Sequence, residues 1–329
     1  MPLLVGLTYD IRSAPPKHAP KDACAEHDSP ETISSVEEAL KSAGHRVGRI
    51  GGSNELLKKF RRLKYDIVFN IAEGISGRNR ESEVPILLDL AGIPYTGPDA
   101  LALAVALDKS AAKKIFRYHG IPTPRYFMAA KADGIAFSGE MEFPVIVKPA
   151  YEGSAKGIWA DSVVKDMRSL KEKAAYVIRT YKQPALIEEF VEGWEFTAGV
   201  IGNTRVSVLP VVERHVCAKS GLSSHVLEKC GHAAPNAGYR KLLGVDPALE
   251  ARIGALAAEA FRALEFRDFA RFDFRVSARG KRIFILEANP LPSLSKDDYF
   301  SMVAELQGLS YADMINRMFG AAIERCGLK

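Results

Sequence analysis

Short apolar runs alternate with amphipathic stretches along the first 70 residues of the chain. The apolar runs predict strands, and the amphipathic stretches predict helices. In chain order these predicted elements are residues 3–9, 34–42, 45–50, 56–63 and 66–71. Such an alternation predicts a parallel, doubly wound sheet, whose ligands bind beyond the carboxyl ends of the strands. The long polar loop over residues 11–30 follows the first strand and is therefore a candidate functional segment.

The remaining chain carries a second set of elements. Helices are predicted at 98–107, 109–117, 164–181 and 247–264, and strands at 143–148, 185–191, 195–201 and 205–212. A strand hairpin and two closing helices follow. We expect a Rossmann-like domain over residues 1–107, a central subdomain over 108–190 and a C-terminal subdomain over 191–329.

The predicted hairpin near the C-terminus holds the most specific polar pattern. Arg271 and Asp273 lie two residues apart on its first strand, and Glu287 and Asn289 lie two apart on its second. Alternate residues share one face of a strand, so a turn centred on Gly280 would bring all four side chains together. Two carboxylates and an amide oxygen suit Mg²⁺. A polar sheet surface without a ligand would give the same pattern.

Two lysines and a glycine loop precede this hairpin. Lys109 opens a predicted helix, and Lys148 ends the apolar run from Pro144 to Val147. The loop over residues 151–157 follows at once, and the backbone N–H groups of such a loop can wrap phosphate oxygens. A lysine that ends an apolar strand suggests a polyanionic ligand, although surface lysines and a plain turn are the ordinary alternatives.

The order of these segments resembles the D-alanine–D-alanine ligase family of ATP-grasp enzymes. The resemblance covers about residues 65–300 and is faint in the first 60. The matching segments are Gly92–Gly97, Asp108–Lys109, Val147–Pro149, Glu152–Ser154, Glu188–Thr197, Arg271–Asp273 and Glu287–Asn289. The implied fold is α/β, with an N-terminal doubly wound parallel sheet followed by a two-subdomain, α+β ATP-grasp unit.

The resemblance also implies which residues bind ATP. Lys109 and Lys148 would grip its phosphates as point charges. Gly153 and Ser154 would lie in the loop that closes over the phosphates, with Ser154 also in a catalytic role. Glu188 would accept a hydrogen bond from the adenine amino group.

Three more residues complete the implied nucleotide site. Phe190 and Val191 would form the hinge strand beside the adenine base. Glu195 would bind the ribose hydroxyls. All three follow Glu188 within a single short segment of the sequence.

The implied metal ligands are Asp273, Glu287 and Asn289, which would hold two Mg²⁺ ions, with Mn²⁺ as an alternative. Arg271 would steady a developing oxyanion. The implied reaction begins with attack of a carboxylate on the γ-phosphate of ATP. An amine then displaces phosphate from the acyl phosphate and forms an amide. The expected partners are thus a carboxylate, expected to be an amino acid, and an amine.

Several substrate-facing positions depart from the family. The family has a His-Gly pair where this chain has residues 70–74, and a Lys-Tyr pair in its lid where this chain has Lys229-Cys230. The family also has a glutamate that holds the ammonium group of the first substrate, and Glu31 is the candidate for it in this chain. Near the serine expected to bind the acceptor, Asp297 and Asp298 would repel a carboxylate. We therefore expect an acceptor other than plain D-alanine, with a cationic or neutral group.

Other functions remain open at this point. A true D-alanine–D-alanine ligase is one, an ATP-grasp phosphotransferase is a second, and a non-catalytic nucleotide-binding module is a third. The pairs His215/Cys217 and Cys230/His232 could also supply four Zn²⁺ ligands, with a polar lid loop as the plainer interpretation.

Composition narrows the class of protein further. The 329 residues are 47% hydrophobic and 26% charged, with a net charge of +5 that is scattered as in Lys58-Lys59 and Arg61-Arg62. This argues against a nucleic-acid partner. No apolar run approaches the roughly 18 residues of a membrane span, and the start predicts a strand, not a signal peptide. Four cysteines without a CxxC pair indicate reduced thiols and a cytoplasmic protein. A homodimer would be typical of the family.

Overall fold

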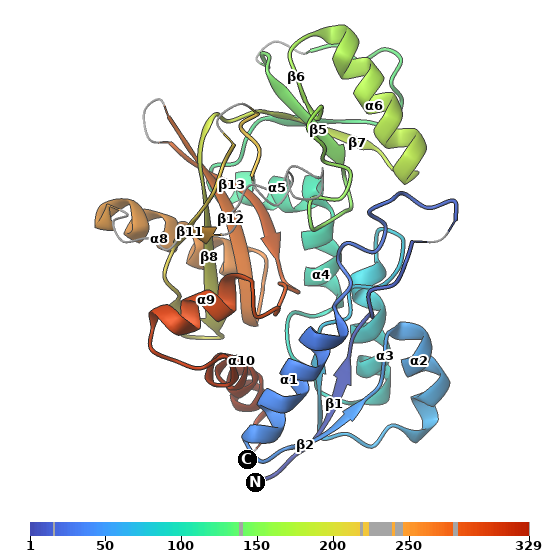
Figure 1. Cartoon of the computed structure of the whole chain (residues 1–329), viewed down its shortest axis with the longest axis vertical. Helices are drawn as coiled ribbons and strands as arrows, with labels where there is room; N and C mark the ends of the chain where they lie inside the picture. Colours follow the sequence, from blue (N-terminus) through green and yellow to red (C-terminus); the bar gives the residue numbers. More distant parts are fainter. Residues whose placement is uncertain are drawn as a thin grey trace.

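Three sheets organise the chain (Figure 1). The computed structural model describes residues 1–15, 17–137, 141–217, 220–223, 239–240, 246–278 and 282–328. The N-terminal sheet is parallel and has the order β2-β1-β3. Its strands are β1 (Leu4–Thr8), β2 (Arg46–Arg49) and β3 (Ile67–Asn70), and its helices are α1 (Pro30–Ser42), α2 (Ser53–Lys59) and α3 (Glu83–Ala91).

The central sheet is antiparallel and has the order β4-β7-β5-β6. Its strands are β4 (Tyr126–Ala129), β5 (Val145–Pro149), β6 (Val163–Val164) and β7 (Ala185–Glu189). Helix α6 (Met167–Tyr181) packs on this sheet through buried Leu170, Ala174 and Val177. Two helices, α4 (Ala100–Leu107) and α5 (Lys109–Tyr118), lead into it from the N-terminal part.

The C-terminal sheet is also antiparallel, with β11-β10-β8-β12-β13 in order and β9 paired to β8. Its strands are β8 (Gly193–Gly202), β9 (Val206–Val208), β10 (Val212–Arg214), β11 (Tyr239–Arg240), β12 (Asp268–Ser277) and β13 (Ile283–Asn289). Its helices are α8 (Pro247–Ala263), α9 (Tyr299–Leu306) and α10 (Tyr311–Cys326). The last two helices share one hydrophobic cluster with α1 and β1, so the two ends of the chain are packed together.

Side-chain alternation along β12 separates core from cavity. Ala270, Phe272 and Phe274 are fully buried in the cluster that includes α8. Arg271 and Asp273 point from the other face and line a cavity. The strand therefore buries a continuous apolar row on one side while it presents charged groups on the other.

The predicted parallel sheet and the antiparallel ATP-grasp sheets are confirmed. The sequence prediction missed α3, β4 and β6. It also began the helix over 164–181 too early, because the Asp166 side chain accepts from Ser169 N–H and caps α6 at Met167. Residues 279–281, where the turn of the β12–β13 hairpin was predicted, lie outside the described residues.

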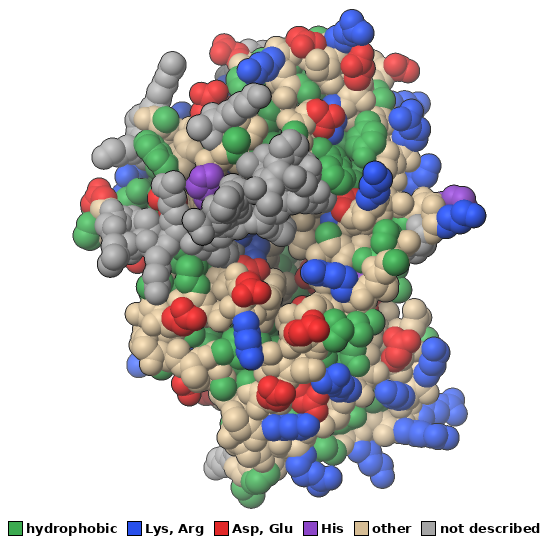
Figure 2. All heavy atoms as spheres, in the orientation of Figure 1, with side chains coloured by type: hydrophobic (Ala, Val, Ile, Leu, Met, Phe, Trp, Pro, Cys, Tyr) green, Lys and Arg blue, Asp and Glu red, His purple; other side chains and the backbone are tan. Residues whose placement is uncertain are grey.

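The surface near α2 carries many of the basic side chains of the N-terminal domain. In Figure 2, Lys and Arg side chains cover this edge and acidic side chains are interspersed among them. Among the described residues, no helix has both the length and the apolar character that crossing a membrane requires.

Asp268 joins three distant parts of the fold. It is fully buried at the start of β12, and its carboxylate accepts from Gly97 N–H at 2.9 Å. It also accepts from Arg325 Nε at 2.9 Å and Nη2 at 2.7 Å. Asp268 thereby ties the N-terminal domain and α10 to the C-terminal sheet.

Replacing Asp268 by Asn should lower the free energy of unfolding by about 2–3 kcal/mol, because Arg325 would lose its buried counter-charge. Asparagine tolerates the left-handed backbone at this position, where φ is 66°. Urea denaturation of the variant measures the change. The control Glu172→Gln breaks an exposed pair with Arg168 and should leave stability unchanged. Equal stability of both variants would contradict the proposed role of Asp268.

Candidate active site

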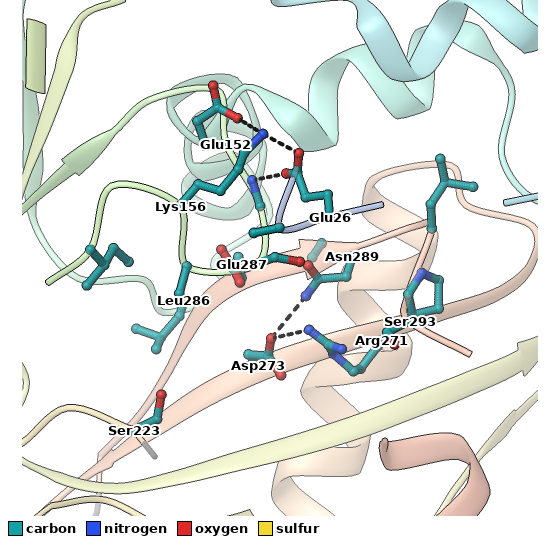
Figure 3. Close-up of a pocket in the computed structure, with 18 of the residues that line it drawn as sticks. Glu26, Glu152, Lys156, Ser223, Arg271, Asp273, Leu286, Glu287, Asn289 and Ser293 are labelled. Carbon is teal, nitrogen blue, oxygen red and sulfur yellow. Dashed lines mark hydrogen bonds and ion pairs between the residues drawn. The ribbon is translucent and has the colours of Figure 1, made fainter. Parts of the chain in front are cut away.

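A cavity of about 530 Å³ lies between the central and C-terminal sheets. The close-up in Figure 3 shows side chains from the hairpin, the glycine loop and the N-terminal loop around it. Among the sequence candidates, all of these line it: Lys109, Lys148, Gly153, Ser154, Glu188, Phe190, Val191, Glu195, Arg271, Asp273, Glu287 and Asn289. Residues predicted from four separate parts of the sequence, namely Lys109, residues 148–154, residues 188–195 and the hairpin, therefore meet at one cavity.

At its charged residues the hairpin has the register that side-chain alternation predicts, and a β-bulge shifts the register between Asp273 and Phe274. Asp273 lies opposite Glu287, and Arg271 lies opposite Asn289. Asp273 Oδ2 accepts from Arg271 Nη2 at 3.1 Å and from Asn289 Nδ2 at 3.0 Å (Figure 3). Thr197 on β8 donates to Asp273 Oδ1 at 2.7 Å. These contacts fix the carboxylate in one orientation within the cavity.

Glu287 faces a lysine from another element. Its Oε2 lies 3.1 Å from Lys109 Nζ at the start of α5. Burial alone would raise the pKa of Glu287, but Lys109 and Lys148 outweigh burial and lower it to about 2. Glu287 is thus an anion at any physiological pH, available to a cation that displaces or joins the lysine.

These residues fit Mg²⁺ better than a metal that requires a full protein cage. Asp273, Glu287 and Asn289 supply hard oxygen atoms on one face of a rigid hairpin. Among the described residues, no cluster of three or more His, Cys, Asp or Glu side chains is arranged to hold a metal. Mg²⁺ commonly takes only one or two protein carboxylates, with phosphate oxygens and water as its other ligands.

Lys148 and Lys113 share one buried carboxylate. Glu188 Oε1 lies 3.1 Å from Lys148 Nζ, and Glu188 Oε2 lies 2.7 Å from Lys113 Nζ. Burial opposes ionisation of Glu188, yet the two lysines hold its pKa below the ordinary value. Both oxygens of Glu188 face lysines here, so its adenine contact stays a prediction. Sequence reasoning missed Lys113, because a lysine inside an amphipathic helix resembles a surface residue.

The predicted ribose residue also has cationic neighbours. Glu195 Oε2 lies 3.0 Å from Arg275 Nη2, and Oε1 lies 3.7 Å from Arg214 Nε. The Arg275 guanidinium lies 5.5 Å from the ring centre of Phe190. The roles of Glu195 and Phe190 toward a nucleotide remain predictions.

The glycine loop has an unusual backbone. Ser154 and Ala155 have φ angles of 45° and 54°, which are uncommon for residues with a side chain. Gly153 donates its N–H to Glu26 of the N-terminal loop. A Cβ on Gly153 would lie 2.6 Å from Glu26 Oε1, so a larger residue would require the Glu26 carboxylate to shift. Backbone strain at single residues, such as these positive φ angles, is typical of ligand-binding loops.

Glu26 is a site residue that sequence reasoning missed. It is buried and accepts from Arg80 Nη2 at 2.8 and 2.9 Å, and it also pairs with Lys156. Burial would raise its pKa, but Arg80 and Lys156 hold it below the ordinary value. The candidate Glu31 is instead exposed in the first turn of α1 and does not line the cavity.

Of the residues that differ from the family pattern at the expected substrate positions, some line the cavity and others do not. Asp298 and Asp297 line the cavity, and Asp298 Oδ2 lies 4.0 Å from Arg271 Nη1. Asn70 is buried and does not line it. The lid pair Lys229-Cys230, and with it half of the predicted zinc set, falls outside the described residues.

Three further carboxylates line the end of the cavity nearest the N-terminal loop. Burial raises the pKa of Asp28 to about 7, although Arg12 opposes the shift. Burial also raises the pKa of Glu81 to about 7, against the effect of Arg80. Burial and the charges of Glu26 and Glu81 raise the pKa of Glu73 well above its ordinary value. No motif in the sequence indicated this acidic cluster.

Comparison with known sequences places the chain among peptide-forming ligases. The profile of the D-ala D-ala ligase C-terminus matches residues 115–320. The D-alanine–D-alanine ligase of Aquifex aeolicus is 32% identical over 286 residues, which cover 87% of this chain and 92% of that protein.

Solved structures share the fold. The D-alanine–D-alanine ligase of Bacillus anthracis complexed with ATP has a TM-score of 0.76 at 20% identity, over 98% of both chains. The VanG D-Ala:D-Ser ligase of Enterococcus faecalis has a TM-score of 0.71 at 18% identity, over 98% of this chain and 100% of that one. The matching profile and the Aquifex aeolicus relative identify the chain as an ATP-dependent ligase of the ATP-grasp superfamily. Within it, the chain belongs to the D-alanine–D-alanine ligase family.

The raised pKa of Glu81 predicts a pH-dependent stability. Between the ordinary pKa of 4.5 and about 7, the folded state keeps a proton that the unfolded state has lost. The free energy of unfolding should therefore fall as pH rises through this window and level off above it.

Glu81→Gln should remove this contribution, so that the variant gains on the order of 2 kcal/mol relative to the native chain as pH rises from about 5 to about 8. Urea unfolding in steps across this range measures the difference. Glu83→Gln, a control at an exposed position, should follow the native profile. Parallel profiles for native protein and Glu81→Gln would mean that Glu81 is ionised throughout.

Proposed function

We propose that this protein joins a carboxylate to an amine through an acyl phosphate, with ATP as phosphate donor and Mg²⁺ as the metal. The observation that carries the proposal is the meeting of Lys109 and Lys148 with Asp273 and Glu287 around one cavity. Lysines suit phosphates and carboxylates suit Mg²⁺, so one cavity satisfies both halves of a metal-nucleotide complex.

In the first step, Lys109 and Lys148 bind the phosphates of ATP, and the loop that contains Gly153 closes over them. Asp273, Glu287 and Asn289 hold Mg²⁺, which would offset the charge of the phosphates as they react. The substrate carboxylate attacks the γ-phosphorus and ADP leaves. Lys109 and Glu287 already form an ion pair, so nucleotide and metal would each replace one partner of it.

In the second step, an amine attacks the acyl carbon and phosphate leaves as the amide forms. Arg271 supports this step because its guanidinium is held beside Asp273 on the cavity face of β12. A fixed cation there would stabilise the oxyanion that develops on the acyl oxygen. Ser154 lies in the loop next to the reacting phosphate.

The nucleotide base would lie beside Phe190 and Val191, with its ribose near Glu195. Glu188 would act at this end of the cavity as well. Its ion pairs with Lys113 and Lys148 support a second task for Glu188, which is to hold Lys148 in place until phosphate binds.

The acceptor substrate should differ from plain D-alanine. Asp298 lies 4.0 Å from Arg271 and partly offsets the positive charge that would attract an acceptor carboxylate. A neutral or cationic acceptor fits this environment better. The alternative is D-alanine–D-alanine ligation itself, which the name of the Aquifex aeolicus relative supports.

A product assay tests the reaction class. Incubation with ATP, Mg²⁺ and pooled amino acids and amines should give ADP, free phosphate and an amide detectable by mass spectrometry. Asp273→Asn should lower turnover by on the order of 100-fold or more, whereas Asp161→Asn at an exposed position should not. A phosphorylated product without free phosphate would establish a phosphotransferase instead.

Asp298→Ser tests the acceptor proposal. The variant should raise kcat/KM for D-alanine as acceptor by about 10-fold or more, because a repelling carboxylate is removed. Asp297→Ser changes an exposed neighbouring carboxylate and should have a smaller effect. Fast turnover of the native enzyme with D-alanine alone would refute the proposal.

A further inference from the structure

The cavity end beside the N-terminal loop holds more carboxyl groups than cationic side chains. Glu26 and Glu152 take up the two buried cations there, Arg80 and Lys156. Asp28, Glu73 and Glu81 also line this end of the cavity. Arg80 and Lys156 make their direct ion pairs with Glu26 and Glu152, so within the described part of the chain neither cation pairs directly with Asp28, Glu73 or Glu81.

Glu81 gives the clearest sign that a ligand belongs here. Its side chain is 6% exposed, yet it lines the cavity. Its Oε2 is buried and accepts no hydrogen bond from any residue in the described part of the chain. A buried oxygen without a partner is costly, and native proteins rarely keep one without a functional reason.

We propose that Asp28, Glu73 and Glu81 form a subsite for a cationic side chain on the substrate whose carboxylate is phosphorylated. The substrate class is a basic amino acid, with a side-chain ammonium or guanidinium. This inference rests on the proposed ligase function and adds the chemistry of one substrate to it.

The location of the subsite selects the phosphorylated substrate. Glu26, which contributes to the field on Glu73, accepts from Gly153 in the loop that would cover the phosphates. A carboxylate that attacks the γ-phosphate must lie near this loop, and the rest of its molecule can extend toward Glu81. The acceptor end, beside Asp298 and Arg271, lies with the hairpin.

The number of carboxyl groups favours a second cationic group over an α-ammonium alone. One ammonium cannot contact all three carboxyl groups, and a second cation would favour their ionised form against the burial that raises their pKa values. Arg12 acts on Asp28 but is exposed, so water screens it. A metal ion is less suitable as the occupant, because among the described residues no three carboxylates are arranged as its ligands.

Calorimetric binding of lysine and norleucine tests the subsite directly. The two molecules differ only in the terminal ammonium, and both enantiomers are titrated in the presence of Mg²⁺ and a non-hydrolysable ATP analogue. Lysine should bind at least 30-fold more tightly than norleucine, as expected for a buried charge-assisted contact. Arginine and citrulline form a second matched pair.

Variants then assign the effect to named residues. Glu81→Gln should reduce the preference for lysine at least 10-fold and leave norleucine binding unchanged, whereas Glu83→Gln should retain the native preference. Because Glu81→Gln removes a buried unpaired carboxylate, its melting temperature should equal or exceed that of the native protein. Glu73→Gln provides a second test if Glu81→Gln is poorly folded.

Three results would overturn the inference. Equal affinity for lysine and norleucine would show that the subsite does not sense a side-chain cation. A preference for lysine that survives in both variants would locate the cation elsewhere. Loss of all amino-acid binding in Glu81→Gln would indicate an α-ammonium site. Failure of the ligase proposal would show separately, as lysine binding without release of phosphate during turnover.

Discussion

The pairing of buried lysines with buried carboxylates is the constraint on which the cavity depends. Lys109 on α5 meets Glu287 on β13, and Lys113 and Lys148 meet Glu188 on β7. An isolated charge at these depths would be very costly, so each pair fixes the relative position of two elements. Helix α5 is thereby tied to β7 of the central sheet through Lys113 and to β13 of the C-terminal sheet through Lys109.

These pairs also explain how the cavity could change partners without losing charge balance. A lysine released by Glu287 or Glu188 would meet phosphate oxygens, and the carboxylate it leaves would meet a metal ion. The exchange keeps every buried charge compensated, which lowers the cost of binding relative to opening an unpaired site. Glu26 is a further buried carboxylate with several partners. It accepts from Gly153 N–H and pairs with Arg80 and Lys156, and so connects the N-terminal loop to the glycine loop.

The sequence predicted those site residues whose contacts follow from local rules, and it missed those whose contacts join distant parts of the chain. The proximity of Asp273, Glu287 and Asn289 could be predicted from the sequence, because strand alternation and hairpin pairing are local rules. Glu26 could not, because it belongs to an aperiodic loop and meets Gly153 127 residues away. Lys113 was missed for another reason, since its helical periodicity does not reveal that the buried face meets Glu188.

The two ends of the cavity differ in whether their carboxyl groups have partners within the protein. At the hairpin end, Glu287 has a lysine partner and Asp273 has Arg271 and Asn289, so each of these two carboxylates has a partner within the chain. At the N-terminal end, Glu81 keeps a buried oxygen without a hydrogen bond from the described residues. Catalytic side chains can have all their partners within the protein before the substrate binds. A residue that selects a substrate needs a polar group that only the correct substrate pairs with. The Glu81 oxygen that has no partner among the described residues is therefore what the proposed substrate preference depends on, beside the N-terminal loop in which resemblance to the family is faint.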